Sequence, residues 1–132
     1  MLEANRQLAR DFVTALSNSE LPDELLTPDM TVWTPTGGTS GKATYQRGIK
    51  VLRKVYTNGV HYTVDSLTAE EDRVVAEVHS DGVLISGEAI QNRFVYIFRI
   101  RDGRIATVME HFDPRQVIEK IAPLMHAAMS KG

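Results

Sequence analysis

The chain has no cysteine, and this absence removes several classes of function. Disulfide-stapled scaffolds, thiolate metal sites and cysteine nucleophiles all need that residue. Without such cross-links the fold needs a hydrophobic core, and 132 residues with 42% hydrophobic content are enough to build one. The lack of cysteine also fits a reducing compartment, so we predict a cytoplasmic location.

A surplus of positive charge and a long apolar run are missing as well. Acidic residues outnumber basic ones by 17 to 15, which gives no support for a nucleic-acid partner. No segment offers the ~20 apolar residues that span a membrane, and residues 1–10 lack the apolar stretch of a signal peptide. Neither repeats nor low-complexity segments divide the chain, so we expect one domain over residues 1–132, without a nucleic-acid or membrane partner.

Helical periodicity dominates the first part of the chain. Apolar residues recur three and four positions apart, and Pro22 suits the first turn of a helix. Ser40 is placed to cap the longest central helix, and Asn58-Gly59 to end it. The predicted elements are helices over residues 3–17, 22–26 and 42–56, and a brief strand over 31–34.

Alternation of polar and apolar residues replaces the helical pattern after residue 60. It predicts strands over residues 61–67, 73–80, 90–101 and 104–112. Asp113 and Pro114 then suit the N-cap and first position of a last helix, Gln116 can complete a capping box, and Pro123 should kink this helix. Helices followed by a run of strands predict an α+β domain with helices on one face of a curved antiparallel sheet.

The turn at residues 101–103 decides which side chains share a face of the last hairpin. A two-residue loop would pair Asn92 with Asp113, whereas a three-residue loop would pair Phe94 with Glu110. A slip of one residue exchanges the two faces of a strand. We favour the three-residue loop because it leaves Asp113 free to cap the helix.

The favoured register predicts two different faces. The covered face is an aromatic wall with one amide and one carboxylate, the usual lining of a small-molecule pocket: Asn92, Phe94, Tyr96, Phe98, Ala106, Val108, Glu110 and Phe112. The other face carries an apolar band between arginines: Arg93, Val95, Ile97, Arg99, Ile105, Thr107, Met109 and His111. A monomer would expose this band, so we expect a homodimer.

Three segments, in this order and spacing, resemble the nuclear-transport-factor-2-like superfamily, also called SnoaL-like or ketosteroid-isomerase-like. They are RDFVTALSNSEL, VWTPTGGTSGK and NRFVYIFRIRDGRIATVMEHFD, at residues 10–21, 32–42 and 92–113. The resemblance covers nearly the whole chain. It implies a cone, in which a strongly curved antiparallel sheet wraps around N-terminal helices and a deep pocket, and commonly a homodimer. Members include isomerases, dehydratases, polyketide cyclases, epoxide hydrolases and proteins that only bind ligands.

The resemblance also implies which activities to expect. Steroid isomerases of the superfamily use a tyrosine and an aspartate where this chain has Phe12 and Thr34, so steroid isomerase activity is not expected. The arginine–aspartate pair of the epoxide hydrolases falls on Val78 and Ser80, so epoxide hydrolysis is not expected either. Polyketide cyclases use an acidic residue of the last strand as general acid–base, and Glu110 matches it.

Glu110 is therefore the predicted catalytic residue, because desolvation among aromatic rings would raise its pKa into the range of acid–base work. The alternative is a structural carboxylate pinned by tyrosine or asparagine donors. The predicted substrate-binding residues are Phe12, Trp33, Tyr45, His61, Asn92, Phe94, Tyr96 and Phe112. For the aromatic residues the alternative is a purely structural place in the core, and for His61 a solvent-facing position. A metal site of His61 with His79 lacks a third ligand, so we predict neither metal nor cofactor.

Two functions follow. The preferred one is cofactor-free acid–base chemistry on a small hydrophobic carbonyl or hydroxyl compound through Glu110. The alternative is a ligand-binding module without turnover, because Phe12 and Thr34 replace the steroid isomerase pair.

Overall fold

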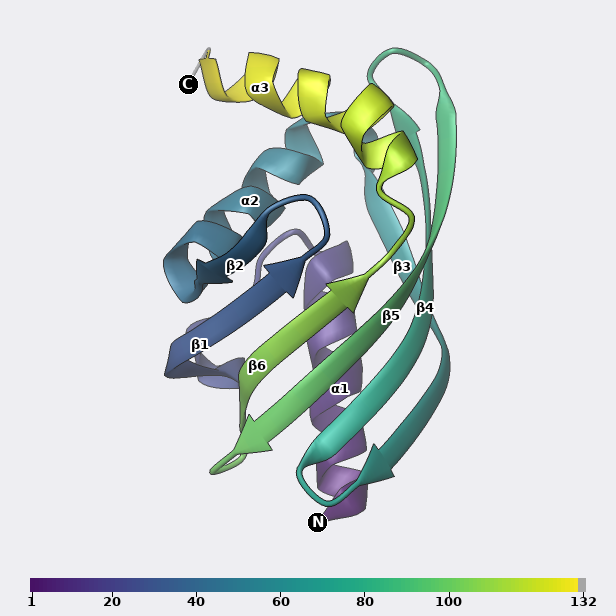
Figure 1. The fold of residues 1–132 in the computed structure, drawn as a ribbon. Helices are drawn as coiled ribbons and strands as arrows, with labels where there is room; N and C mark the ends of the chain where they lie inside the picture. The colour runs from purple at the N-terminus through teal and green to yellow at the C-terminus, as the bar shows by residue number, and fades with distance from the viewer. Residues whose placement is uncertain (131–132) are drawn as a thin grey trace.

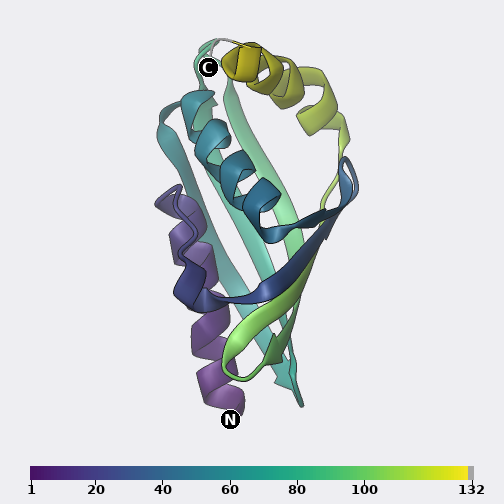
Figure 2. The ribbon, with the colours of Figure 1, turned by 90° about the vertical axis from the view of Figure 1, so that its left-hand side faces the viewer.

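A six-stranded sheet, bent along its length, carries two helices on its inner face and a third across one end (Figures 1 and 2). The computed structural model describes residues 1–130. The elements are α1 (Leu2–Ser17), η1 (Asp23–Leu25), β1 (Leu26–Thr34), β2 (Gly38–Gly41), α2 (Lys42–Lys54), β3 (Tyr56–Glu70), β4 (Arg73–Leu84), β5 (Ala89–Arg101), β6 (Arg104–His111), η2 (Val117–Ile121) and α3 (Ala122–Ser130). The predicted α+β class is confirmed. No helix within residues 1–130 is long and apolar enough to cross a membrane.

The sheet is mixed rather than purely antiparallel. Its strand order is β2-β1-β6-β5-β4-β3, and β1 runs parallel to β6 while all other neighbours are antiparallel. More than half the chain separates β1 from β6, so no tight turn forces them into opposite directions. The sequence pattern indicated the hairpin of β5 and β6, but it contained no information on this long-range parallel pair.

The first-half elements differ from prediction mainly at their ends. The helix expected over 22–26 is the single 3-10 turn of η1, and the strand expected over 31–34 is the nine-residue β1. Ser40 does not cap α2, because Gly41 holds the N-cap position and no side chain bonds there. Asn58 and Gly59, with φ of 62° and 76°, form a bulge inside β3 instead of ending the helix.

The C-terminal helix begins much as expected and then changes form. The Oδ1 atom of Asp113 accepts the backbone N–H of Arg115 at 3.0 Å, as an N-cap does. Gln116 closes no capping box, because its side-chain amide donates to the backbone oxygen of Gln91 at 2.9 Å. The irregularity expected at Pro123 appears as the π-helical turn η2 just before it.

The β5–β6 hairpin overturns the predicted turn but keeps the predicted facing of Glu110. The loop has two residues, Asp102-Gly103, both with positive φ, and Arg101 pairs with Arg104. The register then shifts, which leaves Ala106 unpaired as a bulge and sets Glu110 opposite Tyr96 rather than Phe94. The shorter turn and the bulge each shift the pairing by one residue, so together they leave Glu110 on the predicted inner face.

The same bulge corrects the predicted faces nearby. Ile105, assigned to the outer face, is fully buried with Ile100 in the core. Beyond the bulge the alternation is regular, so the inner face of β5 carries Asn92, Phe94, Tyr96 and Phe98 and the outer face carries the arginines and Val95.

The buried apolar side chains form two separate clusters. The larger one surrounds α1 and contains Phe12, Leu16, Val32, Tyr96, Phe98 and Ile105 among others. The smaller one lies where α3 crosses the sheet, and its buried members are Val55, Tyr56, Val60, Leu84, Ile90 and Ile121. Tyr62 packs against both clusters. The interior is thus divided into two apolar layers along the strands.

Candidate functional site

Glu110 lies on the inner face of β6, where β5 and α2 each bring a tyrosine to it. The Tyr45 hydroxyl, from α2, donates a hydrogen bond to Oε2 at 3.0 Å. The Tyr96 hydroxyl, directly opposite on β5, lies 3.4 Å from Oε1. The first distance is that of an ordinary O–H···O hydrogen bond and the second is longer, so Tyr45 is the stronger donor.

The protein holds this carboxyl group at the edge of ionisation near neutral pH. Burial raises the pKa of Glu110 from its ordinary value of 4.5 to about 7, although the hydrogen bonds from Tyr45 and Tyr96 oppose the rise. Burial also raises the pKa of both tyrosines, and the nearby carboxylate raises it further. The phenols therefore stay protonated and act as donors, while Glu110 can bind or release a proton.

Further aromatic rings pack around the two tyrosines that bind Glu110. Phe12 is fully buried, with its ring centroid 6.3 Å from that of Tyr45 and 6.2 Å from that of Tyr96. Phe94 and Phe112 meet edge to face, at 5.5 Å between centroids, two residues further along the strands. Glu110 and Phe112 keep partial exposure although they face inward, so solvent reaches this level of the interior.

Tyr62 is a member of the site that sequence reasoning missed. It stands on β3, and its ring centroid lies 5.8 Å from that of Phe94. Burial raises the pKa of its hydroxyl, and the Glu110 carboxylate raises it further. Within residues 1–130 its hydroxyl makes no side-chain hydrogen bond, whereas its backbone N–H bonds to Ser17. The sequence did contain a signal for Tyr62. Because consecutive strand residues point to opposite faces, either His61 or Tyr62 had to face inward.

The structure brings together most of the predicted substrate-binding residues but not all of them. Tyr45, Phe94, Tyr96 and Phe112 lie around Glu110, and Phe12 packs behind them without exposed surface. Their role in binding stays a prediction.

Trp33 and His61 do not line this interior, which corrects two predicted positions. Trp33 follows the buried Val32 on β1 and therefore points to the outer face, where its ring lies 5.1 Å from that of His111. His61 is exposed and pairs with the outward-facing Asp81. For His61 this is the solvent-facing alternative, and for Trp33 it follows from the alternation of side chains along β1.

Asn92 is on the predicted wall but is not the partner of Glu110. Four residues separate it from Tyr96 on β5, which is roughly 13 Å along the strand. Its Oδ1 atom accepts the backbone N–H of Arg93 at 3.1 Å. The carboxyl group and the amide are therefore separate polar points on one face, with Phe94 between them.

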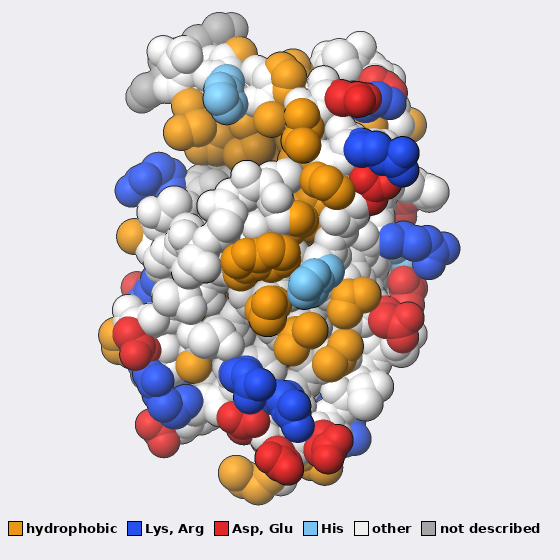
Figure 3. Space-filling model, in the orientation of Figure 1, with side chains coloured by type: hydrophobic (Ala, Val, Ile, Leu, Met, Phe, Trp, Pro, Cys, Tyr) orange, Lys and Arg blue, Asp and Glu red, His pale blue; other side chains and the backbone are white. Residues whose placement is uncertain are grey.

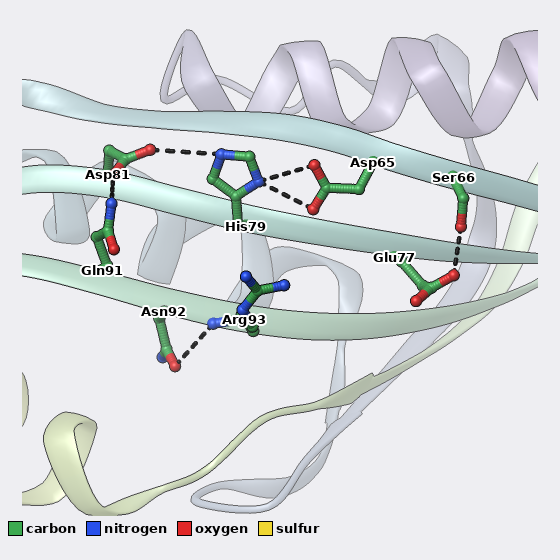
Figure 4. A network of polar contacts seen from close by, with 8 residues as sticks. All are labelled: Asp65, Ser66, Glu77, His79, Asp81, Gln91, Asn92 and Arg93. Atoms are coloured by element: carbon green, nitrogen blue, oxygen red, sulfur yellow. Dashed lines mark hydrogen bonds and ion pairs between the residues drawn. The ribbon is translucent and has the colours of Figure 1, made fainter.

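A polar network occupies the outer face of β3, β4 and β5 (Figure 4). The two ring nitrogens of His79 face carboxylates, with Nδ1 2.9 Å from Asp65 and Nε2 3.5 Å from Asp81. Gln91 in turn donates to Asp81 at 2.6 Å. His79 is thus engaged by its neighbours rather than by His61, and residues 1–130 contain no group of three side chains that could hold a metal ion.

Solved structures similar to this one share its fold. An NTF2-like protein from Anabaena variabilis is 26% identical, with a TM-score of 0.74 over 85% of this chain and 88% of that chain. A proposed SnoaL-like polyketide cyclase from Jannaschia is 18% identical, with a TM-score of 0.76 over 91% and 92%. An LEH-like epoxide hydrolase from M. tuberculosis is 16% identical, with a TM-score of 0.74 over 99% and 98%.

The family comparison is more specific than the likeness of folds. No curated protein sequence matches the chain. The family model described as the SnoaL-like domain matches residues 9–108, which include the second half of α1, strands β1 to β5 and the Tyr45 and Tyr96 partners of Glu110. The chain therefore belongs to the SnoaL-like domain family, within the NTF2-like superfamily.

Proposed function

We propose that this protein performs cofactor-free acid–base chemistry on a small hydrophobic carbonyl or hydroxyl compound, with Glu110 as the group that transfers the proton. One observation carries the proposal: an inward-facing carboxyl group with a pKa of about 7, held by a tyrosine at 3.0 Å inside an aromatic enclosure. A group that titrates at the working pH is the most effective general acid–base.

The neighbouring residues suit that chemistry. In the ionised form Glu110 takes a proton from the carbon next to a carbonyl, and the protonated form then returns it to carbon or gives it to a departing hydroxyl. The hydrogen bond from Tyr45 orients the carboxylate during both steps. The Tyr62 hydroxyl makes no side-chain hydrogen bond within residues 1–130, and in this proposal it donates to the substrate oxygen as negative charge develops there.

A ligand-binding module without turnover is the second candidate. It is favoured by the hydrogen bonds that already reach both carboxylate oxygens, as they would in a structural carboxyl group. Family membership does not separate the two, because the same fold supports both.

Proton exchange of a simple ketone separates the candidates. The protein is incubated in heavy water with para-acetylbiphenyl, and loss of the methyl proton signal is followed by NMR. We expect catalysed exchange that falls by about 10²-fold or more in Glu110→Gln. The matched control is Glu24→Gln on the exposed η1 turn, which should exchange at the wild-type rate. Exchange that persists in Glu110→Gln refutes the role, and binding without exchange in the wild type favours the module.

A further inference from the structure

The boundary between the two apolar clusters is polar on the sheet side. At that level the inward-facing residues of β4 and β5 are Ser80 and Asn92, and neither belongs to the cluster around α1 or to the one under α3. They stand directly opposite each other across the two strands, so their side chains are about 5 Å apart at Cβ. Tyr62 is opposite Ser80 on β3 and completes the row.

Both side chains are deeply buried and yet have free hydrogen-bonding capacity. Ser80 is 3% exposed and Asn92 8% exposed. Asn92 uses its Oδ1 atom on the N–H of Arg93, but within residues 1–130 neither its Nδ2 atom nor the Ser80 hydroxyl has a hydrogen-bond partner. Buried polar groups without partners are rare and call for an explanation.

These free groups are not sealed from solvent. Among the described residues, no side-chain nitrogen or oxygen is both sealed from solvent and without a partner. The Asn92 amide and the Ser80 hydroxyl are therefore reached by a water-sized sphere, although their residues are almost covered. Figure 4 shows the Asn92 amide turned away from the outer-face network of His79 and Gln91, as its burial requires.

We propose that Ser80 and Asn92 form a second polar subsite, which binds an oxygen atom at the far end of the substrate from Glu110. Asn92 Nδ2 donates to that oxygen, and the Ser80 hydroxyl donates to it or accepts from it. The inference rests on the proposed function for the Glu110 end, and it adds the substrate class: an elongated apolar compound with an oxygen function at each end.

The spacing of the two polar points sets the length of that compound. Four strand residues separate Asn92 from Tyr96, the partner of Glu110. Because side chains on a concave face converge, the two ligand oxygens should lie about 10 Å apart. Phe94, Phe112 and the ring of Tyr62 line the interval and suit an apolar, aromatic or alicyclic middle.

Two rigid probes test the subsite. We compare para,para′-diacetylbiphenyl, which has an oxygen at each end, with para-acetylbiphenyl, which has one, by isothermal titration calorimetry. The wild type should bind the diketone about tenfold more tightly, as one added hydrogen bond between uncharged groups allows. Asn92→Leu, similar in shape but without the donor, should lose this preference and keep its affinity for the monoketone.

Controls separate the subsite from folding and from catalysis. Ser80→Ala, a smaller change, should reduce the preference several-fold and serves if Asn92→Leu does not fold. Asn18→Leu, the same exchange at the exposed end of α1, should keep the full preference. Glu110→Gln should also keep it while losing proton exchange.

Each outcome has one reading. Equal binding of both ketones by the wild type, or a preference that survives both Asn92→Leu and Ser80→Ala, overturns the subsite and assigns its polar groups to water. If the wild type catalyses no proton exchange but still prefers the diketone, the proposed chemistry is refuted and the subsite stands.

Discussion

The folded protein should become less stable as the pH rises toward neutrality, because of Glu110. Its pKa is about 7 when folded and near the ordinary 4.5 when unfolded, so between these values the folded state binds more protons. The free energy of unfolding therefore falls as the pH rises through that window, and the stabilising contribution is complete only below it. A rise of this size corresponds to roughly 3 kcal/mol at full burial, and partial exposure reduces the expected loss to about 2 kcal/mol.

Glu110→Gln removes the titration but keeps the size and the hydrogen-bonding reach of the side chain. Compared with the wild type, the variant should gain about 2 kcal/mol of relative stability between pH 4.5 and pH 8. Urea unfolding of both proteins, repeated at several pH values, measures this difference directly. Glu24→Gln, at an exposed position, should follow the wild-type profile. Parallel profiles for the wild type and Glu110→Gln would show that the carboxyl group is not desolvated.

Two further predictions concern the same hydrogen bond and the outer face. Tyr45→Phe should raise the pKa of Glu110 above about 7, because the lost hydrogen bond favours the ionised form, and carbon NMR titration of the carboxyl group measures the shift. A homodimer should form through the outer face, where Figure 3 shows hydrophobic side chains gathered around a histidine and where Val95 and Met109 are 38% and 41% exposed. In light scattering Met109→Glu should give a monomer and Ile118→Glu, an equally apolar exposed position on η2, should not; a monomeric wild type would refute the interface.

Regular periodicity made the main elements and the facing of Glu110 predictable. The helix pattern of residues 3–17 matches α1 almost to the residue, and the alternation of 90–101 matches β5. Side-chain alternation is enforced by backbone geometry over any unbroken strand, so it transfers from sequence to structure. The aromatic wall on β5 was predictable for this reason.

Irregular backbone was not predictable, and it explains the misplaced facing of Ile105 and the misplaced helix end at Asn58-Gly59. The bulges at Asn58-Gly59 and Ala106 each shift a register, and the second lies in a run of ordinary strand residues with no Gly or Pro to mark it. Asn58-Gly59 does contain a signal, but the same pair ends helices and makes hairpins as readily as it makes bulges. Local sequence cannot choose among these outcomes because the choice depends on the neighbouring strand.

The hydrogen bond between Tyr45 and Glu110 could not be predicted from any local pattern in the sequence. Helical spacing put Tyr45 on a buried face of α2, but the two residues are 65 positions apart in the chain. Their meeting depends on how α2 packs across the sheet, which the pattern of neither segment contains. The sequence could therefore supply the carboxylate and predict its desolvation, while the donor that orients it came from the tertiary structure.

One extra residue in β6 determines the chemistry available to the interior. With Ala106 bulged, Glu110 faces inward opposite Tyr96; with the two-residue turn and no bulge, every later residue of β6 would face the other way. Glu110 would then lie on the outer face among exposed groups, and His111 would take its place inside. A bulge interrupts the ladder of strand hydrogen bonds, so it is a cost that the fold accepts at this point. In return, the bulge places an ionisable group where burial raises its pKa. A chemical role for this interior requires such a group.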